Sequence, residues 1–218
     1  MAGSGVFEAI ISGKGGHAAT PQLSIDPILA ASHVIISLHH LVSREADPLD
    51  PQVLTVGKFQ GGGAFNVIPD YVRIGGTFRA FSREGLKHLK QRIEQVIVGQ
   101  AAVQKCNTTV NFLAEKNPLY PPTINNGENL PGINNIDKQP IMAAEDFAFY
   151  QEVIPGYFFI LGMEYNSSEP FRSLHSPYLK INEDGLPYGA ALHASLATSY
   201  LILYQQDVAK VEKSIDEL

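Results

Sequence analysis

Three polar residues in the first half of the chain have side chains suited to holding a carbonyl compound. His17 follows the glycine-rich residues 13–16, and an imidazole there can donate a hydrogen bond to a developing oxyanion. Asn66 follows three glycines, and its amide can donate and accept at once. Arg79 offers a planar fork to a carboxylate. The structural alternatives are surface turns for His17 and Asn66, and an ion pair on a sheet face for Arg79.

The other candidates for chemistry lie in the second half of the chain. His175 stands between a loop and a predicted helix, where ligand histidines and ordinary ones both occur. Glu145 and Asp146 are paired carboxylates just before another predicted helix, and N-capping of that helix is the alternative. The sequence contains no Gly-x-Ser-x-Gly elbow, phosphate loop or His-Glu-x-x-His zinc motif.

Apolar periodicity predicts the elements that must position the first three residues. One helix is expected up to Leu41, capped by Ser24 or Asp26, and a second helix is capped by Ser82. Alternation predicts strands at residues 6–12, 53–59, 71–81 and 108–114. The resulting order β-α-β-β-α-β predicts a ferredoxin-like two-layer sandwich, with helices on one face of an antiparallel sheet.

The rest of the chain predicts only part of an α/β unit. A connector rich in Pro, Asn and Gly comes first, at residues 118–131. Beyond it we expect two short strands, at residues 140–142 and 157–161, and a helix at residues 146–153. A long helix is expected to begin near Pro187 and to run past Leu203. These strands are too few for a satisfactory sheet, and an uncovered sheet exposes apolar surface. The missing strands are therefore expected before Met1.

Composition excludes two classes of partner. The formal net charge is -6 and only 17% of the residues are charged, so no basic face is available for duplex nucleic acid. No apolar run reaches the roughly 18 to 20 residues that a membrane span needs. Cys106 is alone, so no disulfide can form within the chain, and it is expected to be a buried apolar residue.

Signals for the cellular compartment conflict. No signal peptide follows Met1, which predicts a cytoplasmic product for the chain as written. However, the chain ends in Ile215-Asp216-Glu217-Leu218, one residue from the Lys-Asp-Glu-Leu retention signal. Glycosylation sequons also begin at Asn107 and Asn166. Together these signals favour a secretory ancestor whose N-terminus has been lost.

Several segments, taken in order, form a specific combination that covers nearly the whole chain. They are Gly13-Lys14-Gly15-Gly16-His17-Ala18-Ala19-Thr20-Pro21, Phe65-Asn66-Val67-Ile68-Pro69-Asp70, Gly75-Gly76-Thr77-Phe78-Arg79-Ala80-Phe81, Ala144-Glu145-Asp146-Phe147, Leu174-His175-Ser176-Pro177, Asn182-Glu183-Asp184 and Leu186-Pro187-Tyr188-Gly189-Ala190-Ala191. This combination resembles the M20 amidohydrolases, and within them the plant group that releases auxin (indole-3-acetic acid, IAA) from amino-acid conjugates.

The resemblance implies an α+β chain with two parts. In that family a satellite lid domain, also called the dimerisation domain, is inserted into a catalytic α/β domain that carries a two-metal site. Residues 5–115 are similar to the lid, and residues 116–218 resemble the C-terminal part of the catalytic domain. The family further implies a divalent metal (manganese or zinc), a small amino-acid conjugate as substrate, a homodimer or heterodimer through the lid, and the endoplasmic reticulum lumen.

Residue roles carry over by position. His17 would stabilise the tetrahedral intermediate, reaching a site across a dimer interface. Asn66 and Arg79 would bind substrate, with Arg79 on the carboxylate of the conjugate. His175 would be a metal ligand, and Glu145 would contact the metal ligands without binding the metal itself.

The family's remaining ligands lie upstream of the lid and are not in this sequence. They are a Cys, two His and a pair of Glu residues, one of which is the general base. Catalytic zinc sites use about three protein ligands, and a general base contributes on the order of 10²–10⁴ in rate. The first hypothesis is therefore an amidohydrolase fragment that is inactive alone. The alternatives are a non-enzymatic dimerisation module that pairs with a full-length relative, and a small-molecule binding domain of ferredoxin-like shape.

Overall fold

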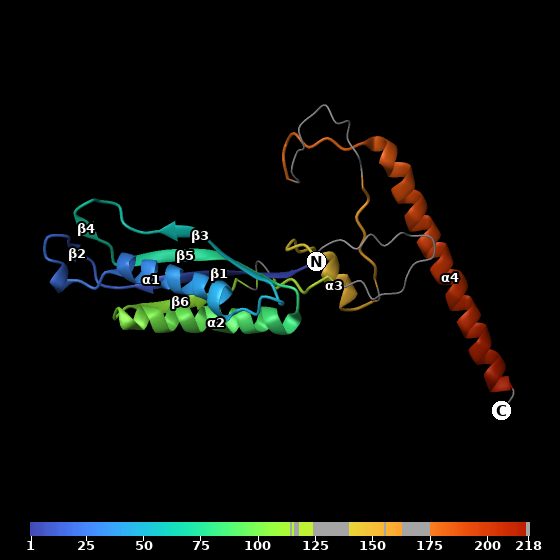
Figure 1. Cartoon of the computed structure of the whole chain (residues 1–218), viewed down its shortest axis with the longest axis horizontal. Helices are drawn as coiled ribbons and strands as arrows, with labels where there is room; N and C mark the ends of the chain where they lie inside the picture. The colour runs from blue at the N-terminus through green and yellow to red at the C-terminus, as the bar shows by residue number, and fades with distance from the viewer. Residues whose placement is uncertain (114, 116–117, 124–139, 155, 163–174, 217–218) are drawn as a thin grey trace. The chain divides into compact units, whose positions relative to one another are not determined.

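Two long strands form the centre of an antiparallel sheet, β1 (Gly3–Ser12) and β5 (Tyr71–Ala80) (Figure 1). Strand β3 (Gln52–Gln60) flanks β5 and strand β6 (Asn107–Asn111) flanks β1, so the order across the sheet is β3-β5-β1-β6. The sequence thus predicted all four strands. The computed structural model describes the 218-residue chain except residues 114, 116–117, 124–139, 155, 163–174 and 217–218.

Two helices cover one face of this sheet, α1 (Pro27–His40) and α2 (Arg83–Val103). The Asp26 carboxylate caps α1, because its Oδ1 accepts from the backbone N–H of Ile28 at 2.8 Å. Ser82 caps α2 in the same way, with its Oγ accepting from Gly85 N–H at 2.9 Å. Of the two capping residues proposed for the first helix, Asp26 is therefore the one used. A π-helical turn (Leu41–Glu45) continues α1.

The core lies between the sheet and these helices. Register pairs Ala9 with Ile74 and Ile11 with Val72, so alternate residues of both central strands point to the helices. Phe78 is fully buried and meets Phe112 edge to face, with ring centroids 6.0 Å apart. Burying each such side chain contributes about 1.5–3 kcal/mol. The mixed sheet-and-helix class predicted from the sequence is confirmed.

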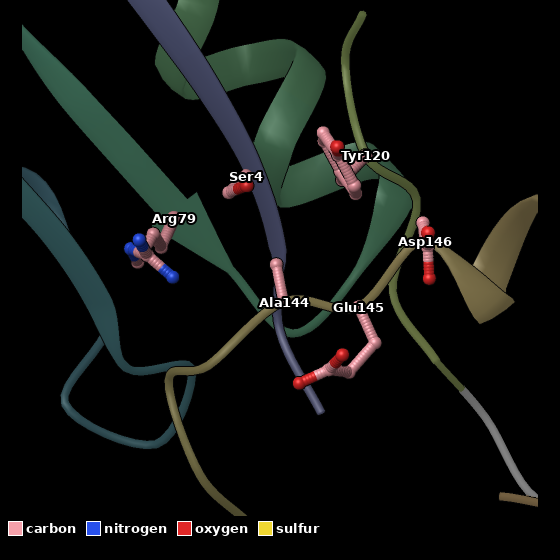
Figure 2. A pocket seen from close by; sticks show the side chains of 6 residues that line it. All are labelled: Ser4, Arg79, Tyr120, Ala144, Glu145 and Asp146. Carbon is pink, nitrogen blue, oxygen red and sulfur yellow. The ribbon is translucent and has the colours of Figure 1, made fainter. Parts of the chain in front are cut away.

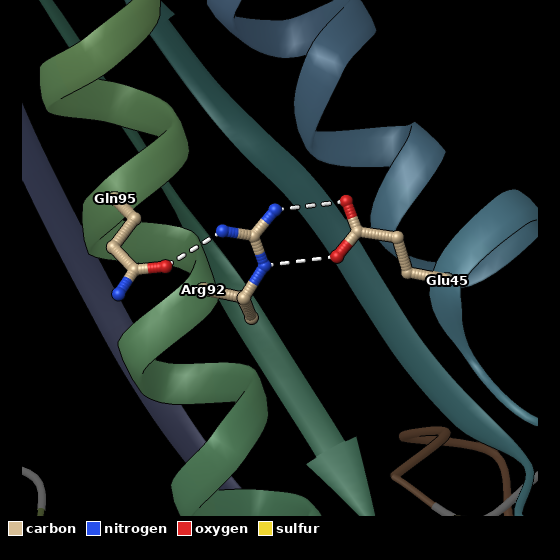
Figure 3. Close-up of polar contacts among 3 residues, drawn as sticks. All are labelled: Glu45, Arg92 and Gln95. Carbon is tan, nitrogen blue, oxygen red and sulfur yellow. Dashed lines mark hydrogen bonds and ion pairs between the residues drawn. The ribbon is translucent and has the colours of Figure 1, made fainter.

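Polar contacts tie the elements of this layer together. Across the open face of the sheet, Lys58 Nζ donates to Glu8 at 2.6 Å. At the end of α1, Arg92 on α2 makes a two-pronged contact with the Glu45 carboxylate, at 2.8 and 2.9 Å, and also donates to Gln95 (Figure 3). These contacts fix α2 against the segment that follows α1.

Two predicted strands are absent. Residues 140–142 form no strand and contribute one backbone bond, from Ala2 N–H to Ile141 O at 3.1 Å. Residues 157–161 are also irregular. Both predictions were wrong, because a strand needs a neighbour for its backbone groups and no described segment pairs with either run. The helix predicted at 146–153 is confirmed in shortened form as α3 (Phe147–Gln151).

The chain divides into two compact units, Met1–Phe158 and Phe159–Leu218. The second unit is dominated by α4 (Leu186–Asp216), which confirms the long helix predicted there. A short 3-10 turn (Glu183–Gly185) leads into it, with Asn182 Oδ1 accepting from Asp184 N–H at 3.0 Å. None of the described helices combines the length and apolar character that a bilayer crossing requires. The sequon at Asn166 lies outside the described residues.

Candidate functional site

The predicted site residues of the first unit fall into two groups at opposite ends of the sheet. A two-stranded ribbon that the sequence did not predict, β2 (Gly16–His17) with β4 (Val67–Ile68), lies beyond the end of β5 that begins at Tyr71. We call this ribbon and its turns the tip. Arg79 lies near the other end of β5, opposite Ser4.

The tip brings His17 and Asn66 together. His17 pairs with Val67, and the backbone N–H of Ala18 donates to Asn66 O at 3.0 Å. The turns that allow this depend on glycine: a Cβ at Gly13 would overlap the carbonyl oxygen of Ile25, and one at Gly16 would overlap the Ser24 hydroxyl. Gly13 is therefore required by close packing against the backbone, and Gly16 by close packing against the Ser24 side chain.

The hydrogen bonding of His17 determines what its ring can do. Its Nδ1 accepts from the backbone N–H of Ala19 at 3.1 Å, so a neutral ring carries its proton on Nε2. The side chain is exposed, as is that of Asn66. The tip thus presents an Nε2–H donor and an amide to a molecule outside this unit, which suits a developing oxyanion and a carbonyl.

Arg79 lines a hollow of about 290 Å³ at the other end of the sheet (Figure 2). Its Nη1 donates to the backbone carbonyl of Met142 at 2.7 Å. No carboxylate among the described residues forms an ion pair with it, so the predicted alternative of a structural ion pair is not observed there. The other residues that line the hollow are Ser4, Tyr120, Ala144, Glu145 and Asp146.

Glu145 faces this hollow from the segment before α3. N-capping was the structural alternative for the carboxylate pair, and Asp146, at the N-cap position, makes no side-chain cap bond. The capping alternative is therefore wrong for Asp146. The hollow combines a guanidinium with two carboxyl groups, and it can take a polar ligand that carries both an acceptor and a donor.

Distance separates the two groups within one chain. Tyr71 and Arg79 are eight residues apart on β5, which corresponds to about 27 Å along a strand. A small conjugate cannot bridge such a distance. The structure therefore brings His17 and Asn66 together but does not bring Arg79 to them.

His175 lies in the second unit and has a left-handed backbone, with φ of 68°. Non-glycine residues rarely adopt this conformation, and they do so more often at functional positions. The described residues contain no cluster of three or more His, Cys, Asp or Glu side chains that could hold a metal. Since a catalytic metal needs about three protein ligands, the described part of the chain does not by itself fit one.

Ser4 and Tyr120, which line the hollow, and Met142, which accepts a hydrogen bond from Arg79, were missed from the sequence. Tyr120 reaches the hollow through a bridge with Ser4, in which each residue's backbone N–H donates to the other's carbonyl at 2.9 and 3.0 Å. The Met142 carbonyl also takes part, through Arg79. No pattern of residue types marks a backbone carbonyl or a lone bridge, so the sequence held no signal for them.

Comparison with known protein families identifies the family that residues 2–104 match. Residues 2–104 match the M20 family model described as a peptidase dimerisation domain. These residues belong to the M20 dimerisation family. The match spans three strands of the sheet (β1, β3 and β5), both covering helices and the tip, and it ends before β6.

Relatives along the whole chain agree with this family. The chain is 57% identical over 229 aligned positions to IAA-amino acid hydrolase ILR1-like 4 of Arabidopsis thaliana, with 100% of this chain and 52% of that protein covered. It is 37% identical to an N-acetyl-L-cysteine deacetylase of Bacillus subtilis, over 85% of this chain and 45% of that protein. The chain thus spans about half the length of the curated relatives that it matches.

A solved M20 structure has the same fold. The Bacillus subtilis YXEP protein, a dinuclear metal binding peptidase from the M20 family, superposes with a TM-score of 0.70 at 28% identity. The superposition covers 92% of this chain and 51% of that one. The resemblance to M20 hydrolases expected from the sequence is confirmed.

Proposed function

We propose that the chain is part of an M20 amidohydrolase that hydrolyses IAA–amino acid conjugates. The observation that carries this proposal is the 57% identity, along the whole chain, to a protein named as an IAA-amino acid hydrolase. Residues 5–115 would be its ferredoxin-like lid, since the sheet order and the two covering helices fit that arrangement. Residues 116–218 would be the C-terminal part of the catalytic domain.

The proposed roles follow from what each side chain offers. His17 would donate from Nε2 to the oxyanion that forms when the amide carbonyl is attacked. Asn66 would hold the substrate, and the guanidinium of Arg79 would bind the conjugate's carboxylate while Nη1 stays on Met142 O. Glu145, which faces the same hollow, would contact the metal ligands without binding the metal itself.

A divalent metal, manganese or zinc, is part of the proposal, and His175 would be one of its ligands. Such an ion makes hydroxide available near neutral pH and polarises the scissile carbonyl. The M20 relative of known structure, a dinuclear metal binding peptidase, supports this part of the proposal. Because His175 would be the chain's contribution and about three protein ligands are needed, we propose that these 218 residues alone do not turn over substrate.

The test is an assay of the purified chain with indoleacetyl-alanine and Mn²⁺. We expect no released IAA above the buffer blank, and release once a polypeptide supplying the upstream ligands of a relative is added. Turnover by the chain alone that survives repurification and disappears in His175→Ala would contradict the proposed inactivity. No release in either case would contradict the assignment as part of a conjugate hydrolase.

A second candidate function is a dimerisation module without catalysis of its own. The match of residues 2–104 to a dimerisation domain favours it. In this role the chain would pair with itself or with a full-length relative, and it would supply His17 across the interface or block assembly. Co-expression with a tagged full-length relative tests this: co-purification with a changed activity of the relative is expected, and no association would exclude the heteromeric form.

The compartment is the last part of the proposal. The C-terminal Ile215-Asp216-Glu217-Leu218, one residue from the Lys-Asp-Glu-Leu signal, supports the endoplasmic reticulum lumen for the parent enzyme.

A further inference from the structure

One motif of the sandwich has no part in the proposed site: the glycosylation sequon Asn107-Thr108-Thr109. It begins β6, an edge strand that pairs only with β1 among the described segments. The acceptor in such a sequon is the side-chain nitrogen of the Asn, and the sugar that it receives is bulky. A modification therefore requires an amide that the fold does not use and an open surface around it.

The fold does not use the Asn107 amide. Asn is depleted in strands and normally serves in caps and turns, where its side chain bonds to nearby backbone groups. Asn111, at the other end of β6, has such a role, because its Oδ1 accepts from Leu113 N–H at 2.7 Å. Within the part of the chain that the structure describes, Asn107 makes no side-chain hydrogen bond. A structural role thus accounts for Asn111 and leaves Asn107 unexplained.

The turn before the sequon determines the direction in which Asn107 points. Helix α2 ends in a Schellman motif, in which Cys106 N–H donates to Ala101 O at 3.0 Å and Lys105 N–H donates to Ala102 O at 2.9 Å. Lys105 is the left-handed residue of this motif, with φ of 60°. Cys106 is buried against the core. Since side chains alternate along a strand, Asn107 points to the opposite face.

That face is the open face of the sheet, away from α1 and α2. Thr108 pairs with the core residue Ile11, whereas Asn107 pairs with Ser12 on the open side. Asn107 and Thr109 are both exposed there, so the acceptor amide and the hydroxyl of the sequon lie on one accessible surface. Ser12, the cross-strand neighbour of Asn107, is small. The folded sheet therefore has room for a sugar at this position.

We propose that Asn107 carries an N-linked glycan. The inference rests on the endoplasmic reticulum compartment under Proposed function, and it is independent of the hydrolase activity. The donor is an oligosaccharide linked to a lipid diphosphate. The Asn107 amide nitrogen loses a proton and attacks C1 of the first sugar, the N–C1 bond forms, and the bond from C1 to the diphosphate oxygen breaks. The lipid diphosphate leaves with that electron pair, so no oxidant or reductant is needed.

A glycan at Asn107 also suits the edge on which it lies. An edge strand exposes unpaired backbone groups, and charged side chains or a covering element usually protect it from pairing with other chains. Strand β6, with the sequence Asn-Thr-Thr-Val-Asn, contains no charged residue. The glycan would supply the hydrophilic cover that this edge otherwise lacks.

The test places the full 218-residue chain behind a cleavable signal peptide in insect cells, so that entry into the endoplasmic reticulum is supplied. Enzymatic release of N-glycans in heavy-oxygen water labels each Asn that carried one, and peptide mass spectrometry locates the label. We expect the label at position 107. Release should need no denaturant, because the site is exposed on the folded sheet.

Two substitutions of Thr109 form a matched pair. Thr109→Val keeps the β-branched shape and removes the hydroxyl that the sequon requires, whereas Thr109→Ser keeps the hydroxyl. All proteins carry Asn166→Gln, so that the second sequon is silent. The mobility shift caused by glycan release should be lost in Thr109→Val and in Asn107→Gln, and it should persist in Thr109→Ser. A bare Asn107 in the parent protein, or a shift that survives Asn107→Gln, overturns the inference.

Translation in the presence of microsomes gives the same readout if a variant is not recovered from cells. A protease-protected chain with a glycan at Asn107 is expected, and a protected chain without one overturns the inference.

Failure of the proposed compartment is read separately, from the C-terminus. A retained chain should hold a glycan that endoglycosidase H removes, and deletion of residues 215–218 should release the chain to the medium. Secretion of the undeleted chain with its glycan would contradict the retention signal and would support the modification of Asn107.

Discussion

The sandwich of the first unit buries its large apolar side chains, whereas helix α4 of the second unit leaves several of them exposed. Phe7, Phe78 and Ile93 are buried between sheet and helices, whereas Leu201 on α4 is 59% exposed. Ile202 and Leu186 on the same helix are also at least half exposed. The sandwich closes its core with its own elements. Helix α4 carries more apolar surface than its described unit covers, and such surface marks a packing face.

Truncating a large side chain in each region is the strongest test of this contrast. Phe78→Ala should lower the free energy of unfolding by about 3–5 kcal/mol, because it leaves a cavity in the core. Leu201→Ala should change it by less than about 0.5 kcal/mol, since its side chain is largely in solvent. Urea unfolding followed by circular dichroism measures both. A comparable loss in Leu201→Ala would show that α4 is packed in solution, and the contrast would fail.

A smaller effect should show whether residues 140–146 dock on the sandwich. Arg79→Met removes the charge-assisted bond to Met142 O and should cost about 1–2 kcal/mol. Amide hydrogen exchange of Ala2, whose N–H donates to Ile141 O, should accelerate as this segment loosens. Arg83→Met is the control, because Arg83 pairs with Glu152 in a largely exposed ion pair. Equal protection of Ala2 in both variants would mean that Arg79 does not hold the segment.

The smallest effect concerns pH. The hydrogen bond from Lys58 lowers the pKa of Glu8, and the one from Arg92 lowers the pKa of Glu45. A carboxylate of lowered folded-state pKa stabilises the fold fully above its unfolded pKa of about 4.3, and this contribution is lost as the pH falls through the folded value. The variant in which Glu8 and Glu45 are both replaced by Gln should lose about 0.5–1 kcal/mol less of its free energy of unfolding as the pH falls, a small difference because both ion pairs are partly exposed.

Glu94→Gln is the control for this titration, because Glu94 makes no ion pair among the described residues. Chemical unfolding between pH 3 and pH 7 compares the variants, a range chosen to bracket the carboxylate titration. An unchanged acid slope in the double variant would show that these pairs do not contribute to the stability of the sandwich.

Local patterns predicted the elements of the sandwich well. Alternation over residues 71–81 identified the central strand, Ser82 was identified as a cap, and Asp26 was one of the two residues proposed as the other cap. These features depend on neighbours in sequence, which a pattern records. The strands at 140–142 and 157–161 were mispredicted because strand formation depends on a partner elsewhere in the chain.

For the candidate site, the sequence alone determined which side chains could act: the imidazole of His17, the amide of Asn66, the guanidinium of Arg79 and the ring of His175. Tertiary structure decided which of them meet. It joined His17 to Asn66 through a ribbon of four residues, turned Arg79 to a backbone carbonyl, and placed the two groups at opposite ends of a ten-residue strand. The reason is physical: residue chemistry belongs to each side chain, whereas proximity depends on the register of strands distant in sequence.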